Sequence, residues 1–135
     1  FAYLTEVFYS LLDSVELCQF VYGPAWTLYG PAETVDMIRA VTGWDITLED
    51  LMTVGERRLN LFRTFNAREG LDRKADKLPK KFFKQLQGAG PTAGIALTEA
   101  DVESAIDEYY RLAGWTSNGI PTSETMERLD IAWAL

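Results

Sequence analysis

The apolar positions near the start of the chain recur at steps of three and four residues. They are Leu4, Val7, Phe8, Leu11 and Val15. Charged and hydroxyl side chains fall on the other side, and this spacing is typical of an amphipathic helix. The pattern therefore predicts a first helix that turns one apolar face toward a core.

A second helix is predicted to begin at Pro31, after a loop that contains two Gly-Pro pairs. Proline suits the first turn of a helix because its missing N–H would have no intrahelical partner there. Val35, Ile38 and Val41 give this helix an inward stripe, and Gly43 suits the position just after its end.

The third predicted helix is the longest and runs from a Thr47 cap to Gly70. Thr47 and Asp50 have the spacing of a capping box, with Asp in place of Glu. Gly55 inside this helix costs roughly 1 kcal/mol relative to Ala, which favours a close helix crossing at that point. The predicted inward stripe comprises Leu48, Leu51, Met52, Gly55, Leu59, Phe62, Asn66 and Glu69.

A basic segment follows, and its side chains are Arg73, Lys74, Lys77, Lys80, Lys81 and Lys84. We interpret it as a solvated face. The alternative is a docking patch for an acidic electron carrier, which would act by electrostatic steering and be sensitive to salt.

The rest of the chain predicts a helix from a Thr98 cap to Ala113 and a short helix near Thr122 or Ser123. No segment alternates apolar and polar residues as a strand would. We therefore predict an all-α fold, a multihelical orthogonal bundle of about five to six helices, in a single domain over residues 1–135.

Composition narrows the functional classes. The 135 residues carry a net charge of −7, which argues against nucleic acid as a partner. Three acidic residues interrupt the apolar stretch 1–20, so no membrane span is expected there. The single cysteine excludes an internal disulfide and fits a reducing, cytoplasmic compartment.

The chain contains no histidine, which removes the most common base and metal ligand. Ser-His and Cys-His nucleophiles are therefore excluded within it. No P-loop, G-x-G-x-x-G or C-x-x-C motif is present, and the acidic residues are spread over the predicted helix surfaces. A site built from carboxylates alone stays open, but this distribution of acidic residues does not indicate a complete enzyme.

Cys18 has two interpretations. On a continuous first helix it would lie near Val7 and Leu11, where a free cysteine behaves as a small apolar core residue. Alternatively it is one corner of a metal site. On a continuous helix Asp13 points well over a right angle away from Cys18, so both reach one ligand only if the helix ends between them.

Asn66 and Glu69 continue the inward stripe of the third helix as polar residues. Buried amides and carboxylates need partners. They are either solvated or bound to backbone at the helix end, or they belong to an internal polar network or a cofactor contact.

Five phrases of the sequence, taken together, resemble the C-terminal region of the aldehyde:ferredoxin oxidoreductase family. They are DSVELC, TGWDIT, GERRLNLFRTFNAREG, DKLP and EYYRLAGWTSNGIPT, and the resemblance covers about residues 13–129. Members of that family are tungsten or molybdenum enzymes with a bis-pterin cofactor. The resemblance implies an all-α part of an oxidoreductase.

In that family a D-x-x-G-L-C motif supplies a pterin contact and the last ligand of a 4Fe–4S cluster. The resemblance implies that Asp13 binds the pterin, that Cys18 is the fourth cluster thiolate, and that the backbone around Leu17 lies between the two groups. Asn66, Arg68 and Glu69 are weaker candidates for residues behind the cofactor. The family's proposed catalytic Glu and His lie upstream, so no catalytic residue is expected here.

Glu16 stands where the family motif has glycine. Glycine permits a left-handed turn that glutamate adopts only at some cost. The backbone at this position is therefore either less strained than in the family, or Glu16 makes a different contact.

The resemblance implies that this chain is a C-terminal fragment of a larger oxidoreductase, and a first residue Phe1 already in a helical pattern fits that expectation. The fragment alone should be inactive and free of metal. Expected partners are the upstream domains and ferredoxin or a similar electron carrier, and exposed apolar faces favour a homodimer. The alternative function is a helical protein-interaction module without redox chemistry.

Overall fold

The computed structural model describes residues 1–23 and 28–134. These residues form six α-helices and three short 3₁₀ helices, with no strand among them, so the predicted all-α class is confirmed. The α-helices are α1 (Ala2–Ser14), α2 (Gln19–Tyr22), α3 (Pro31–Thr42), α4 (Leu48–Arg68), α5 (Glu99–Ala113) and α6 (Ser123–Arg128). The 3₁₀ helices are η1 (Arg73–Ala75), η2 (Lys80–Phe83) and η3 (Ala132–Ala134).

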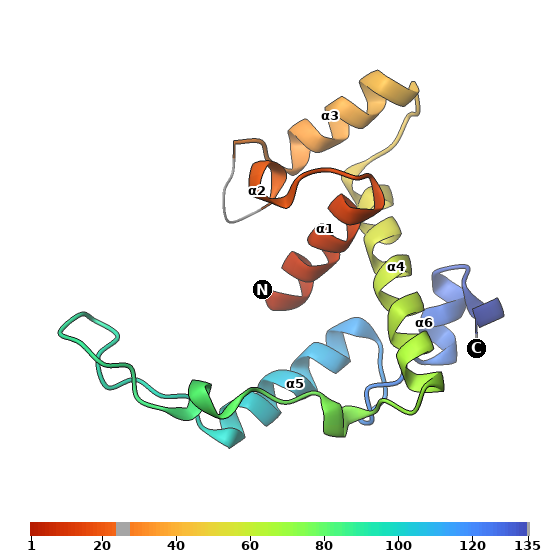
Figure 1. Cartoon of the computed structure of the whole chain (residues 1–135). Coiled ribbons are helices and arrows are strands. Elements are labelled where there is room, and N and C mark those ends of the chain that lie inside the picture. The colour runs from red at the N-terminus through yellow and green to blue at the C-terminus, as the bar shows by residue number, and fades with distance from the viewer. Residues whose placement is uncertain (24–27, 135) are drawn as a thin grey trace.

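Helix α4 is the central element (Figure 1). Helices α1, α2 and α3 lie toward its start, while α5 and α6 lie on opposite sides of its end (Figure 1). Between η1 and the start of α5 the chain runs outward and returns as an arm, which is closed by hydrogen bonds between Leu86 and the Gly94–Ile95 segment. None of the helices in the described residues has the length and apolar character needed to cross a bilayer.

The helix boundaries follow the predicted caps. Thr47 accepts a hydrogen bond from the Asp50 amide and completes a capping box, and Thr98 does the same with Asp101. Gly43 and Gly70 follow the ends of α3 and α4 with φ of 72° and 85°. These angles lie in the left-handed region that glycine adopts most easily, so these helix ends were correctly predicted.

The crossing of α1 and α4 occurs at Gly55, as predicted. A side chain at this position would overlap the backbone oxygen of Val7. The Ser10 hydroxyl donates a hydrogen bond of 2.9 Å to the Gly55 carbonyl at the same crossing. Beside it, the core is built from Phe8, Leu11, Leu12, Val35 and Leu51.

Several predicted core positions are exposed. Leu4, Val41 and Phe62 are 61%, 81% and 55% exposed, and Leu48 is also exposed. Helical periodicity predicts the side of a helix on which residues lie, but it does not predict which element covers that side. These four side chains therefore lie outside the buried core of the described residues. The buried residues of α4 are Leu51 and Gly55, as predicted, together with Asn60 and Thr64, which were not predicted.

The basic segment lies along the arm, where its lysines are exposed. Arg73 differs from them because it turns inward. Its guanidinium lies 2.6 Å from a carboxylate oxygen of Glu103 and 2.6 Å from one of Asp107. Arg73 therefore ties the arm to α5, and only the lysines fit the predicted solvated face.

Candidate functional site

Helix α1 ends between Asp13 and Cys18. The last helical residue is Ser14, and Glu16 follows with φ of 57°, in the left-handed region. The Leu17 amide donates a hydrogen bond of 2.9 Å to the Leu12 carbonyl across this turn. Such a bond from two residues past the cap back into the last turn is the Schellman arrangement, which is usually built around glycine.

Glu16 therefore keeps the left-handed backbone that a glycine would adopt. For a residue with a side chain this conformation costs about 1 kcal/mol or more. The sequence left two alternatives for position 16: a less strained backbone than in the family, or a different contact made by Glu16. The first alternative is wrong, because the backbone is left-handed. The packing of Leu17 against the cluster that contains Leu11 and Leu12 helps to hold the turn.

Cys18 is an exposed free thiol at the N-cap position of α2. Its interpretation as a core residue is wrong for this chain, because α1 stops before reaching it and its side chain leaves the apolar face of that helix. The Cys18 carbonyl oxygen accepts hydrogen bonds of 3.0 Å from the amides of Val21 and Tyr22. The short helix α2 thereby fixes the backbone that carries the thiol.

The Asp13 carboxylate is held by two partners. Gln19 Nε2 donates to Oδ1 at 2.7 Å, and Arg58 Nη1 lies 3.1 Å from Oδ2. Gln19 belongs to α2 and Arg58 to α4, so the carboxylate connects the two helices next to the turn. Sequence analysis missed Arg58, since no spacing pattern relates it to Asp13.

A cavity of about 410 Å³ lies between α1 and α4, and both Asp13 and Asn66 are among its lining residues. It is lined by Glu6, Tyr9, Ser10, Asp13, Arg58, Leu59, Phe62, Arg63, Asn66 and Trp115. Arg68 and Glu69 are exposed at the end of α4 and do not line this cavity. Of the three weaker candidates, only Asn66 therefore lines the same cavity as Asp13.

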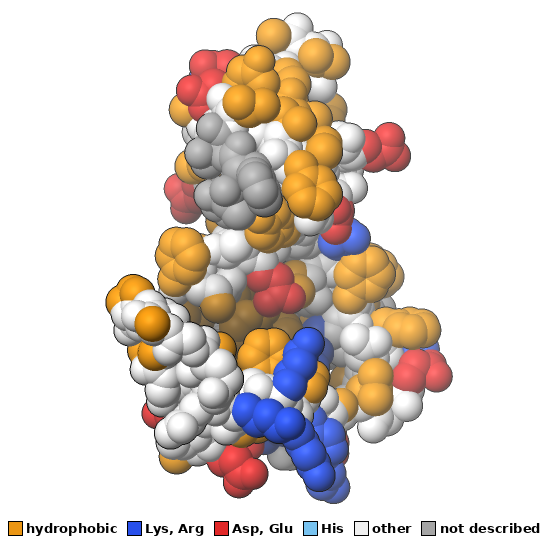
Figure 2. All heavy atoms as spheres, turned by 60° about the vertical axis from the view of Figure 1, so that its left-hand side comes forward, with side chains coloured by type: hydrophobic (Ala, Val, Ile, Leu, Met, Phe, Trp, Pro, Cys, Tyr) orange, Lys and Arg blue, Asp and Glu red, His pale blue; other side chains and the backbone are white. Residues whose placement is uncertain are grey.

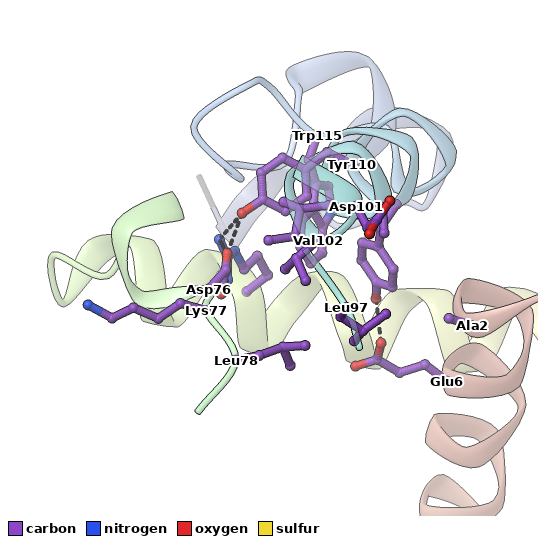
Figure 3. Close-up of a pocket in the computed structure, with 14 residues that line it drawn as sticks. Ala2, Glu6, Asp76, Lys77, Leu78, Leu97, Asp101, Val102, Tyr110 and Trp115 are labelled. Atoms are coloured by element: carbon purple, nitrogen blue, oxygen red, sulfur yellow. Dashed lines mark hydrogen bonds and ion pairs between the residues drawn. The ribbon is translucent and has the colours of Figure 1, made fainter. Parts of the chain in front are cut away.

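A second cavity of about 500 Å³ lies between the arm, α1 and α5, and its lining is mostly apolar (Figure 3). Figure 2 shows a hollow with hydrophobic side chains on its floor and basic side chains at its edge. Glu6 and Tyr109 form a hydrogen bond of 2.7 Å at one end of this cavity. Burial, with the bond to Glu6 second, raises the pKa of Tyr109.

Arg63, Asp76 and Tyr110 form a polar network at the other end of the second cavity. Arg63 Nη1 and Nη2 lie 3.0 and 2.5 Å from the two Asp76 oxygens, and the Tyr110 hydroxyl donates to the same carboxylate. Burial acts to raise the pKa of Asp76, but the hydrogen bonds from Arg63 and Tyr110 outweigh it and hold that pKa below its usual value. The network joins α4, α5 and the end of η1, and Figure 3 shows Asp76 facing Tyr110.

The described geometry offers one exposed thiol and one anchored carboxylate on either side of a left-handed turn. Within the described residues, no three His, Cys, Asp or Glu side chains come close enough together to hold a metal ion. The fold and the turn thus define an all-α helical module that presents two potential ligand groups at one helix junction.

The chain belongs to the aldehyde ferredoxin oxidoreductase family. The model of that family, described as "Aldehyde ferredoxin oxidoreductase, domains 2 & 3", matches residues 1–131. The resemblance inferred from the five sequence phrases is thereby confirmed.

Two relatives from Pyrococcus furiosus illustrate the similarity. A tungsten-containing aldehyde ferredoxin oxidoreductase is 37% identical over 125 residues, which is 91% of this chain and 19% of that protein. An aliphatic sulfonate oxidoreductase, described as a WOR-like subunit, is 33% identical over 137 residues, or 97% of this chain and 20% of that protein. The chain therefore spans about a fifth of the length of these curated relatives.

A solved structure shares the fold. It is the active-site complex BamBC of benzoyl coenzyme A reductase with 1,5-dienoyl-CoA, which aligns with a TM-score of 0.75 at 23% identity. The alignment covers 98% of this chain and 19% of that one. At this identity the similarity supports the arrangement of helices alone.

Proposed function

We propose that this chain is the C-terminal helical part of a tungsten or molybdenum bis-pterin oxidoreductase, in which Cys18 is one thiolate ligand of a 4Fe–4S cluster and Asp13 contacts the pterin. The observation that carries this proposal is the left-handed turn at Glu16. Because α1 ends between Asp13 and Cys18, Cys18 does not continue the apolar face of that helix, which is the condition for both residues to serve one site.

The residues at the turn fit the two groups. A 4Fe–4S cluster is held by four thiolates, and Cys18 offers one that is free and exposed. The Asp13 carboxylate accepts hydrogen bonds, as the N–H groups of a pterin ring require, and its anchoring by Gln19 and Arg58 limits its motion. The other three thiolates would come from upstream residues.

When bound, the metal–pterin group would supply the redox chemistry and the cluster would pass electrons onward. The contribution of this chain is to place the two ligands. Leu17 lies between them in sequence, and its packing against the core fixes the backbone that would separate the pterin from the cluster.

The reaction follows the names of the relatives. We propose oxidation of an aldehyde, with ferredoxin or a similar carrier as electron acceptor, as in the printed names of the tungsten-containing relatives. Reduction of a related acyl or aromatic substrate is the second choice. The name of the aliphatic sulfonate oxidoreductase indicates that relatives of this chain do not all share one substrate class. A reducing, cytoplasmic compartment suits the free thiol of Cys18.

The exposed apolar side chains fit a chain that packs against further domains. Leu4, Val41, Trp44 and Phe65 are each at least 60% exposed. Burial of such side chains contributes roughly 1.5 to 3 kcal/mol each. Produced alone, the chain should be inactive, metal-free and prone to self-association through these faces. These exposed apolar side chains also favour the alternative function, a helical protein-interaction module without redox chemistry.

Metal content tests the proposal. The enzyme that contains this chain is purified without oxygen, as wild type and as Cys18→Ser, and its iron, tungsten and molybdenum are measured. About four irons per polypeptide with tungsten or molybdenum in the wild type, and iron lost in the variant, support it. Wild-type protein without these metals would instead favour the interaction module.

A further inference from the structure

Arg58 is the only described residue of α4 that forms an ion pair with Asp13. Its Nη1 lies 3.1 Å from Asp13 Oδ2 and 3.4 Å from the Ser10 hydroxyl, so it bridges two residues of α1 that are nearly one turn apart. The side chains of Arg58 and Asp13 are partly exposed, at 35% and 40%. A surface ion pair of this kind contributes little to stability, so its geometry matters more than its energy.

The orientation of Arg58 is set from its own helix. The guanidinium lies over the ring of Phe62, 4.7 Å from its centroid, and Phe62 stands one turn further along α4. A cation above an aromatic face is held by the ring quadrupole. Arg58 therefore reaches Asp13 from a fixed direction.

The Asp13 carboxylate is fixed on both oxygens and still has capacity to bind. Gln19 occupies a position on Oδ1 and Arg58 one on Oδ2. An ionised carboxylate offers about four acceptor positions, so two remain for a ligand. Asp13 and Arg58 both line the cavity between α1 and α4.

We propose that Arg58 is a positioning residue that fixes the Asp13 carboxylate for a ligand carrying N–H donors. The inference rests on the proposed function, in which that ligand is the pterin. Arg58 acts through Asp13: without its cation the carboxylate keeps only the Gln19 contact and can rotate away from the donors. Partners that orient a ligating group in this way typically change affinity about 10- to 100-fold when removed from metal sites.

Arg57 provides a matched control. It is the neighbouring arginine on α4, and it faces α6 instead of α1. Its Nε donates to the Leu129 carbonyl at 2.7 Å, and its Nη2 lies 3.5 Å from Asp130. Replacing Arg57 removes the same charge and a comparable number of contacts without touching Asp13.

The test uses the whole enzyme, purified without oxygen, as wild type, Asp13→Asn, Arg58→Ala, Arg58→Lys and Arg57→Ala. Pterin per polypeptide is measured by fluorescence after oxidation and release, and iron per polypeptide is measured on the same samples. We expect Arg58→Ala to lose pterin at least several-fold while it retains iron, Arg58→Lys to recover part of the loss, and Arg57→Ala to match the wild type.

Two results would overturn the role of Arg58. One is wild-type pterin in Arg58→Ala together with loss in Asp13→Asn, and the other is equal loss in the Arg58→Ala and Arg57→Ala proteins. Wild-type pterin in Asp13→Asn would instead overturn the proposed Asp13 contact, and with it the basis of this inference. If Arg58→Ala does not fold, Arg58→Met keeps an apolar stem over Phe62 and gives the same comparison.

Discussion

The backbone of Gly55 on α4 touches the backbone carbonyl of Val7 on α1 so closely that no side chain fits between them. This contact sets the separation of the two helices that carry Asp13 and Arg58. The position of the candidate site therefore depends on Gly55, which has no side chain and takes no part in binding.

Gly55→Ala should destabilise the protein. Alanine gains about 1 kcal/mol of helix propensity over glycine. The overlap with Val7 forces α1 and α4 apart, and overpacking of this kind costs about 1 to 3 kcal/mol. Because the obstructing atoms belong to the backbone, we expect the cost to win and the thermal midpoint to fall. Far-UV circular dichroism measures it, and an unchanged or higher midpoint would contradict the crossing.

Glu16→Gly should stabilise the protein by up to about 1 kcal/mol, because it relieves a left-handed residue that has a side chain. Ser14→Gly is the control, since Ser14 is the last helical residue of α1, where glycine is less favourable than serine and no left-handed strain is relieved. Denaturant unfolding of both variants gives the comparison. Equal destabilisation by the two changes would show that residue 16 is not in the left-handed conformation.

Asn60→Leu should cost about 1 to 3 kcal/mol, because it leaves the partly buried indole N–H of Trp115 without its acceptor. Asn60 is fully buried, and its Oδ1 accepts a hydrogen bond of 2.8 Å from Trp115 Nε1. In a Trp115→Phe background the N–H is gone, so the same change should cost less. Additive effects in this double-mutant cycle would contradict the bond.

Tyr110 should make stability depend on alkaline pH. Burial, with the bond to Asp76 second, raises the pKa of Tyr110 to about 12 in the folded protein. A group whose pKa is raised by folding contributes stability below its unfolded pKa of about 10, and loses it as pH rises through the folded value. Tyr110→Phe should therefore flatten the loss of stability between about pH 10 and 12. Tyr22→Phe is the control, because the Tyr22 hydroxyl donates to the sulfur of Met37 and not to a carboxylate.

Asp76 should make stability depend on acid pH in the opposite sense. Its folded pKa lies below the ordinary value of 3.8. The stability from its bonds with Arg63 and Tyr110 is therefore present above that ordinary value and lost as pH falls through the lower, folded one. Asp76→Asn should weaken this acid dependence in urea titrations below about pH 4. An identical acid profile in wild type and variant would contradict the network.

The helix boundaries could be predicted from sequence because they depend on local chemistry. Thr47, Thr98, Gly43 and Gly70 act within one turn of the ends they cap, so spacing alone identifies them. The end of α1 was different. Glutamate at position 16 carries no signal for a left-handed turn, and the core packing of Leu17 that supports it depends on tertiary structure.

The candidate site was accessible from sequence only through the family motif. That motif pointed to Asp13 and Cys18, whereas Arg58 lies 45 positions from Asp13 and meets it only because α1 crosses α4. Exposure of Leu4 and Val41 could not be predicted either, since it depends on which element covers each helix face. The binding of cluster and pterin stays a prediction.

The most direct test of the central claim is the electron paramagnetic resonance spectrum of the whole enzyme, purified without oxygen, compared between wild type and Cys18→Ala. A cluster with four thiolate ligands gives a reducible 4Fe–4S signal. The account predicts that removal of the Cys18 thiolate converts this signal to that of a three-iron cluster or abolishes it. An unchanged 4Fe–4S spectrum in the Cys18→Ala protein would show that the cluster is held elsewhere.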